Sequence, residues 1–178
     1  MSAADRDPAQ ARIHARMVAF VPRLRRFCHG LTGNADRGDD LLQATVERAL
    51  DRIAQWQDGT SLENWMFRMA SNLNIDQLRA QKVRGFPVAI EEAWDLPGED
   101  ALARLEFRSE MEAVRAALAA MPVELRAVMA TVTLDGRSYR EAAEILDIPI
   151  GTVMSRLSRA RGFVEAHVNR CGTAGGTP

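Results

Sequence analysis

The sequence predicts an all-α fold of two small helical bundles joined by a linker, with a helix-turn-helix in the C-terminal bundle. Through most of the 178 residues, apolar side chains recur at steps of three and four, and strand-like alternation is nearly absent. The period lapses in one internal stretch that is rich in proline, glycine and acids. With 47% hydrophobic and 26% charged residues, the composition is typical of an ordinary globular protein.

The first two predicted helices lie before residue 58. Apolar positions of the first are Met17, Phe20, Val21, Leu24, Phe27, Cys28 and Leu31. It ends at Gly33-Asn34. Apolar positions of the second are Leu42, Val46, Ala49, Ile53 and Trp56. Asp39 and Asp40 lie near its start, where carboxylates favour the helix dipole, and Asp58-Gly59 marks a turn.

A third helix follows the tetrapeptide Thr60-Ser61-Leu62-Glu63, which has the form of a capping box with Thr60 as the capping hydroxyl. Its apolar residues are Leu62, Trp65, Met66, Met69 and Leu73. Three helices are enough to close one small bundle, and we assign it to residues 1–86. Cys28 and Trp65 are expected in its core.

Regular order weakens after Gly85, and we predict a linker over residues 87–105. It contains two prolines and several acids, with a short helix expected around Ile90 to Trp94. A second domain is predicted over 106–170. Within it, Pro122 starts a helix at its first turn and Asp135-Gly136 ends that helix. Residues 171–178 are expected to form a disordered tail.

The most informative segment is Ser138 to Val164. Ser138-Tyr139-Arg140-Glu141 forms a second capping box, and Asp147-Ile148-Pro149 breaks the helix that follows it. Another helix begins near Ile150. Two short helices joined by a tight turn are the helix-turn-helix pattern.

The last helix has two distinct faces. An apolar stripe is formed by Val153, Leu157, Ala160 and Val164, and the opposite face presents Gly151, Ser155, Ser158, Arg159 and Gly162. Small residues around one arginine suit a helix lying in the major groove, where Arg pairs with guanine. Arg156 and Arg161 flank this face, and no acid occurs between Gly151 and Arg161. The competing interpretation is an exposed arginine face that is simply solvated.

A second basic cluster follows the third helix. It comprises Arg79, Lys82 and Arg84, preceded by Asn72, Asn74 and Asp76. Cations beside amides and aromatic residues suit single-stranded DNA. The alternative is a basic helix end that complements the helix dipole.

Several function classes are excluded. His14, His29 and His167 are far apart, and the two cysteines, Cys28 and Cys171, form no disulfide framework or zinc motif. Phosphate-binding glycine loops and nucleophile elbows are absent, so we expect no enzyme, cofactor or metal. The net charge of −1 means that any DNA binding comes from local patches. No signal peptide or membrane-spanning run is found, which predicts a cytoplasmic protein without membrane insertion.

Three blocks in order resemble the extracytoplasmic-function sigma factors, which keep sigma regions 2 and 4. They are LTGNADRGDDLLQATVERAL, SLENWMFRMASNLNIDQLRAQ and LDGRSYREAAEILDIPIGTVMSRLSRAR, and together they cover most of residues 24–165. The resemblance implies a chain that binds core RNA polymerase and directs it to promoter DNA, in a stress or environmental response. It also implies an anti-sigma protein as a regulator.

The resemblance further implies roles for single residues. Those implied to dock on core polymerase are Asp39, Asp40, Leu41, Gln43, Thr45 and Arg48. Those implied to engage the −10 element are Asn72, Asp76, Arg79, Lys82 and Arg84. Those implied to read the −35 element are Thr152, Ser155, Arg156, Ser158 and Arg159. The chain departs from the family pattern at Ala44, where Glu is common, and at Met154, where Lys or Arg is frequent.

Two other functions compete with this one. A free-standing regulator would use the same helix-turn-helix, but residues 1–90 contain no clear dimer interface or sensor domain. A helical adaptor that binds only proteins would keep its function after Arg159→Ala.

Overall fold

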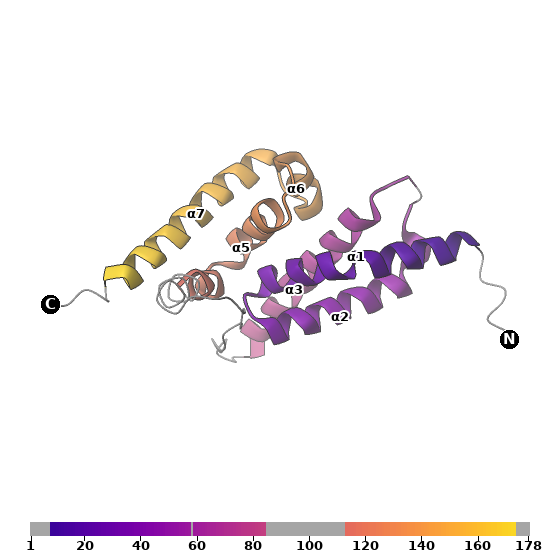
Figure 1. Ribbon diagram of the computed structural model, residues 1–178, viewed down its shortest axis with the longest axis horizontal. Helices are drawn as coiled ribbons and strands as arrows, with labels where there is room; N and C mark the ends of the chain where they lie inside the picture. The colour runs from indigo at the N-terminus through magenta and orange to yellow at the C-terminus, as the bar shows by residue number, and fades with distance from the viewer. Residues whose placement is uncertain (1–7, 58, 85–112, 174–178) are drawn as a thin grey trace, which may run out of the picture.

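The computed structural model describes residues 8–57, 59–84 and 113–173, and every regular element in these ranges is helical. The N-terminal half consists of α1 (Pro8–Thr32), α2 (Ala35–Asp51), a 3-10 turn (Ile53–Gln55) and α3 (Leu62–Arg84). In the C-terminal half, residues 113–120 are helical and precede α5 (Val123–Met129), a π-helical turn (Ala130–Leu134), α6 (Tyr139–Leu146) and α7 (Ile150–Thr173). The predicted all-α class and the two helical groups are confirmed (Figure 1).

The first three helices pack around an aromatic centre. The Phe67 ring of α3 lies 4.9 Å from that of Phe20 and 4.4 Å from that of Phe27, both on α1. Cys28 is fully buried, as predicted, and burial raises the pKa of its thiol to about 12. Trp65 is half-buried against the same core.

Three predicted details of the helix ends are wrong. Ser61, not Thr60, caps α3: its hydroxyl accepts a bond from the Asn64 amide at 3.1 Å, whereas the Thr60 hydroxyl donates to the Gln57 carbonyl. α2 ends at Asp51, so Ile53 lies in the 3-10 turn that follows. α7 continues to Thr173, past the predicted start of the tail.

Two other helix boundaries that the sequence predicted coincide with glycines that have a positive φ. α1 ends at Thr32 and is followed by Gly33, whose φ of +67° favours glycine. Asn34 then caps α2, because its side chain accepts a hydrogen bond from the Arg37 amide. The turn after α5 closes at Gly136, with φ +71°. The predicted linker, its short helix at 90–94 and residues 174–178 lie outside the described residues.

Candidate nucleic-acid interface

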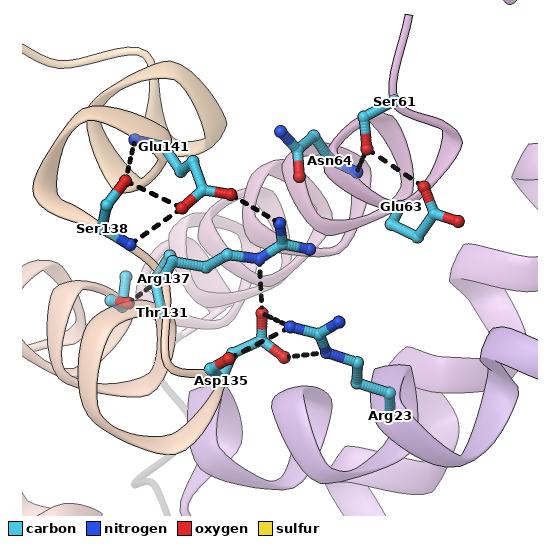
Figure 2. A network of polar contacts seen from close by, with 10 residues as sticks. Arg23, Ser61, Glu63, Asn64, Thr131, Asp135, Arg137, Ser138 and Glu141 are labelled. Carbon is cyan, nitrogen blue, oxygen red and sulfur yellow. Dashed lines mark hydrogen bonds and ion pairs between the residues drawn. The ribbon is translucent and has the colours of Figure 1, made fainter.

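The helix-turn-helix begins with the predicted capping box. The Glu141 amide donates to the Ser138 hydroxyl oxygen at 3.3 Å, and the Ser138 amide donates to the Glu141 carboxylate at 2.9 Å (Figure 2). The Glu141 carboxylate accepts bonds from the Ser138 amide, the Ser138 hydroxyl and Arg137, and these lower the pKa of Glu141 to about 2. Asp147 ends α6 with a left-handed φ of 53°, and α7 begins three residues later. Local hydrogen bonds and the left-handed residue thus define where α6 begins and ends.

The faces of α7 are arranged as the helical wheel predicts. Val153, Leu157 and Ala160 are buried in the C-terminal core. Along the opposite face, Ser155, Ser158 and Arg159 are exposed. Arg159 Nε donates to the Ser155 carbonyl at 3.3 Å, which holds the side chain along the helix. This face therefore presents one arginine among hydroxyls and glycines, with no acid beside it.

Two other residues predicted to contact the −35 element are less exposed than Ser155, Ser158 and Arg159. Thr152 and Arg156 are half-buried at the edge of the outward face. Met154, at the position where the resemblance leads one to expect a cation, is 54% exposed. Thr152 and Arg156, four residues apart, share one edge of the outward face, and Met154 lies at the other edge.

The predicted −10 residues lie on the C-terminal half of α3. Asn72, Asp76 and Arg79 are exposed, with Asp76 and Arg79 3.9 Å apart. Such an exposed ion pair contributes little to stability, so both side chains remain available to a ligand. Lys82 and Arg84 belong to the last turn of the same helix. Asn74, which the sequence grouped with them, is instead buried and donates to the Leu31 carbonyl of α1 at 3.4 Å.

The predicted polymerase-docking residues separate into two groups. Leu41 and Thr45 are fully buried, and the Thr45 hydroxyl donates to the Leu41 carbonyl at 2.6 Å. Assigning them as direct contacts is therefore incorrect, because they face the core and support α2 from beneath. Asp40 and Gln43 are exposed, and Arg48 is half-buried.

Asp39 is already paired within the chain. Both of its oxygens accept from Arg25, at 2.8 and 2.7 Å, and one lies 2.7 Å from His29 Nε2. The bonds from Arg25 and then His29 hold the pKa of Asp39 well below its usual range. The α1–α2 surface therefore presents this carboxylate as part of an ion cluster.

Sequence reasoning missed a hollow of about 350 Å³ at the start of α3. Trp56, Trp65 and Arg68 help to line it, together with Glu144 of α6. In the described part of the chain, two buried atoms beside it, Trp56 Nε1 and Asn64 Oδ1, have no hydrogen-bond partner. The turn between Trp56 and Trp65 shows no helical period of apolar residues, so the sequence did not indicate that the two side chains lie together. The only available signal was the presence of two tryptophans near a turn.

The described residues contain no group of three or more side chains able to hold a metal ion. Over the same ranges, no helix is both long and apolar enough to cross a bilayer.

Comparisons with known proteins agree with this architecture. Residues 17–71 match the model described as "Sigma2 domain of PhyR", and residues 111–164 match "Sigma-70, region 4". The ECF RNA polymerase sigma factor EcfG of Rhodopseudomonas palustris is 39% identical over 153 residues, covering 84% of this chain and 81% of that protein. The ECF sigma factor SigW of Bacillus subtilis is 28% identical, covering 80% and 81%.

A solved structure shares both halves. The sigma factor RpoE of Bartonella quintana, in complex with the anti-sigma factor NepR, aligns with a TM-score of 0.67 and 26% identity. The alignment covers 88% of this chain and 96% of that one. The chain belongs to the extracytoplasmic-function (ECF) family of RNA polymerase sigma factors.

Proposed function

We propose that the two halves divide the work of promoter recognition. The N-terminal helices bind core RNA polymerase and the −10 element, and the helix-turn-helix binds the −35 element. Nucleotide chemistry belongs to the polymerase. The observation that carries the proposal is the outward face of α7, where Ser155, Ser158 and Arg159 are exposed with no acid nearby. A face of this chemistry suits base edges and phosphates in the major groove.

For the other sites, the proposal keeps only exposed or edge residues as direct contacts. On α2 these are Asp40, Gln43 and Arg48, with Asp39 acting as part of its ion cluster. On α3 they are Asn72, Asp76 and Arg79. We extend this α3 set to Lys82 and Arg84 on the last turn.

The proposed domains are residues 1–86 and 106–170, joined by a linker at 87–105. The family matches at 17–71 and 111–164 fall inside these two units, which supports the division. A sigma factor acts where polymerase and chromosome are, so we assign the chain to the cytoplasm.

We also propose regulation by a small anti-sigma protein, within a stress or environmental response. Support comes from the Bartonella quintana relative, which was solved with the anti-sigma factor NepR bound. The expected result is that a NepR-type protein from the same genome abolishes transcription by this chain at equimolar concentration. Undiminished transcription at saturating concentrations of every such protein would contradict this part of the proposal.

The test of the main proposal is run-off transcription with core polymerase across a genomic promoter library. We expect new start sites that share a two-part upstream element. Arg159→Ala should weaken −35 duplex binding by about 10- to 100-fold and relax the base preference at one position, because a bidentate contact with guanine is lost.

Arg161→Ala is the matched control on the same helix, because Arg161 is exposed at the edge of the reading face. It should weaken binding to all sequences equally and lower the salt dependence by about one phosphate contact. If Arg159→Ala leaves start sites and base preference unchanged, α7 does not read promoters.

A further inference from the structure

Two large apolar side chains are exposed at the start of α7. Met154 is 54% exposed and Ile150 is 49% exposed. A single exposed apolar side chain is ordinary on a protein surface. These two, however, are four residues apart on one helix, so they are neighbours on the same side of it. They form a short apolar ridge directly after the turn of the helix-turn-helix.

This ridge borders the outward face of α7. At 100° per residue, Met154 lies about 40° around the helix axis from Ser158, one turn later. Ser158 is exposed and belongs to the face proposed to read base edges. Val153 and Leu157, which lie on the core side of the helix, are buried. Met154 therefore projects from the exposed side of α7, next to the residues that read DNA.

The Met154 side chain also has room to move. With Tyr139, Ser158 and Arg161, it helps to line a hollow of about 480 Å³ between the start of α6 and α7. Methionine is unbranched and carries a polarisable sulfur, so it adapts its shape to the surface that it contacts. The side chain can therefore follow a ligand laid against α7 without a change in the backbone.

The charges around the ridge identify DNA, and not a protein, as its ligand. Arg159 and Arg161 are exposed on the same helix. No acid occurs from Gly151 to Arg161, and the first acid of α7 is Glu165. Exposed arginines of this kind hold phosphates and so position a helix in a groove. On the base edges of the major groove, the apolar group is the C5 methyl of thymine.

We propose that Met154 is a specificity-determining residue, whose thioether packs against the C5 methyl of one thymine in the −35 element. The inference rests on the proposed function, because it assumes that α7 lies in the major groove. Met154 is the fifth residue of α7, in the N-terminal part of a recognition helix that reaches base edges. Arg159 then selects guanine through hydrogen bonds, and Met154 selects thymine through apolar contact.

Removing the methyl from the DNA and the thioether from the protein tests this contact from both sides. The −35 element is first read from the start sites of the wild-type chain. Each thymine on either of its strands is then replaced in turn by deoxyuridine, which lacks only the C5 methyl. Binding to these promoter duplexes is measured by competition, with holoenzyme assembled from the full chain and core polymerase.

With the wild type, deoxyuridine at one position should weaken binding about fourfold, which equals the 0.8 kcal/mol of one buried methyl-sized group. With Met154→Ala, thymine and deoxyuridine at that position should bind equally. Met154→Leu stays apolar and should keep at least about twofold discrimination. Since Met154 is exposed and alanine is the stronger helix former, Met154→Ala should fold as the wild type does.

Arg161→Ala is the matched control, because Arg161 lies on the same side of α7 seven residues after Met154. It should weaken binding to both duplexes equally and leave their ratio unchanged, since a phosphate contact does not sense a methyl group on a base. The inference is overturned if the wild type binds every deoxyuridine duplex as tightly as its thymine counterpart. It is also overturned if the discrimination persists in Met154→Ala.

This inference and the proposed function fail differently. If Arg159→Ala relaxes the base preference but no deoxyuridine weakens binding, α7 reads the −35 element without Met154. If neither Arg159→Ala nor any deoxyuridine changes binding or start sites, α7 does not read promoters, and both proposals are overturned.

Discussion

Replacing Arg126 by Met should destabilise the whole chain. Arg126 is 4% exposed, and its guanidinium donates to three carbonyls: Leu31 at 2.6 Å, Leu118 at 2.9 Å and Ala119 at 3.1 Å. Burial, with the nearby Arg37 charge, lowers its pKa from 12.5 to about 10. At 1.36 kcal/mol per unit, the penalty on the charged form is about 3 kcal/mol.

The hydrogen bonds outweigh this penalty. Bonds to a charged group contribute about 1.5–3 kcal/mol each, and removing the donor also leaves buried carbonyls unpaired. We therefore expect Arg126→Met to lower the free energy of unfolding by about 3 kcal/mol. With a urea dependence of about 2 kcal/mol per molar, the midpoint should fall by about 1.5 M.

The assay is urea unfolding followed by far-ultraviolet circular dichroism at 25 °C. Arg52→Met makes the same change at an exposed arginine and should stay within about 0.5 kcal/mol of wild type. Arg126→Lys, which keeps the charge but not the fork of donors, should fall between the two. If Arg126→Met shifts the midpoint no more than Arg52→Met, the assignment of the buried guanidinium as a link between the halves is refuted.

Two further predictions concern local structure. Ser138→Ala should cost about 1 kcal/mol by removing the cap of α6. It should also raise the pKa of Glu141 part of the way from about 2 towards 4.5, because the bond from the Ser138 hydroxyl is lost while those from the residue 138 amide and Arg137 remain. A lowered carboxyl pKa stabilises the folded chain at pH values above the ordinary carboxyl pKa, and this stabilisation is lost as the pH falls through about 2. The wild type should therefore keep the stabilisation to a lower pH than the variant. Titration of the carboxyl groups by NMR measures the pKa of Glu141, and an unchanged pKa in the variant would contradict the prediction. Gly38→Ala places a Cβ 2.9 Å from the His29 backbone and should lower Tm by about 3–8 °C. Gly162→Ala is the control: its Cβ would meet nothing within 4 Å, so the variant should raise Tm slightly. Calorimetry measures both Tm values, and equal shifts for the two variants would contradict the argument that Gly38 packs against His29.

The sequence predicted those structural features that depend on interactions between residues close together in the chain. The capping box at Ser138, the break at Asp147 and the two faces of α7 follow from short-range hydrogen bonds and a 3.6-residue period. The apolar period also predicted the burial of Phe27 and Cys28. Which of the neighbouring hydroxyls, Thr60 or Ser61, caps α3 was not predictable in this way, because it depends on how the preceding turn positions each side chain.

The candidate sites were only partly predictable. Leu41 and Thr45 belong to the same sequence motif as Asp40 and Gln43. In the structure the first two are buried and the last two are exposed, because α1 and α3 cover one side of α2. The hollow beside Trp56 likewise needs α3 and α6 to approach each other. Neither result follows from the spacing of residues on a single helix.

By itself, the sequence determined the helical regions, the capping box at Ser138, the helix-turn-helix and the acid-free face of α7. Only the tertiary structure decided that Arg23 meets Asp135, 112 residues away, and that Arg126 meets Leu31, 95 residues away. The physical reason is that helix period and capping act within one turn, whereas such pairings depend on how two finished bundles fit. Gly33, which the sequence predicted as part of a helix end, and Gly30 are points where the two halves touch.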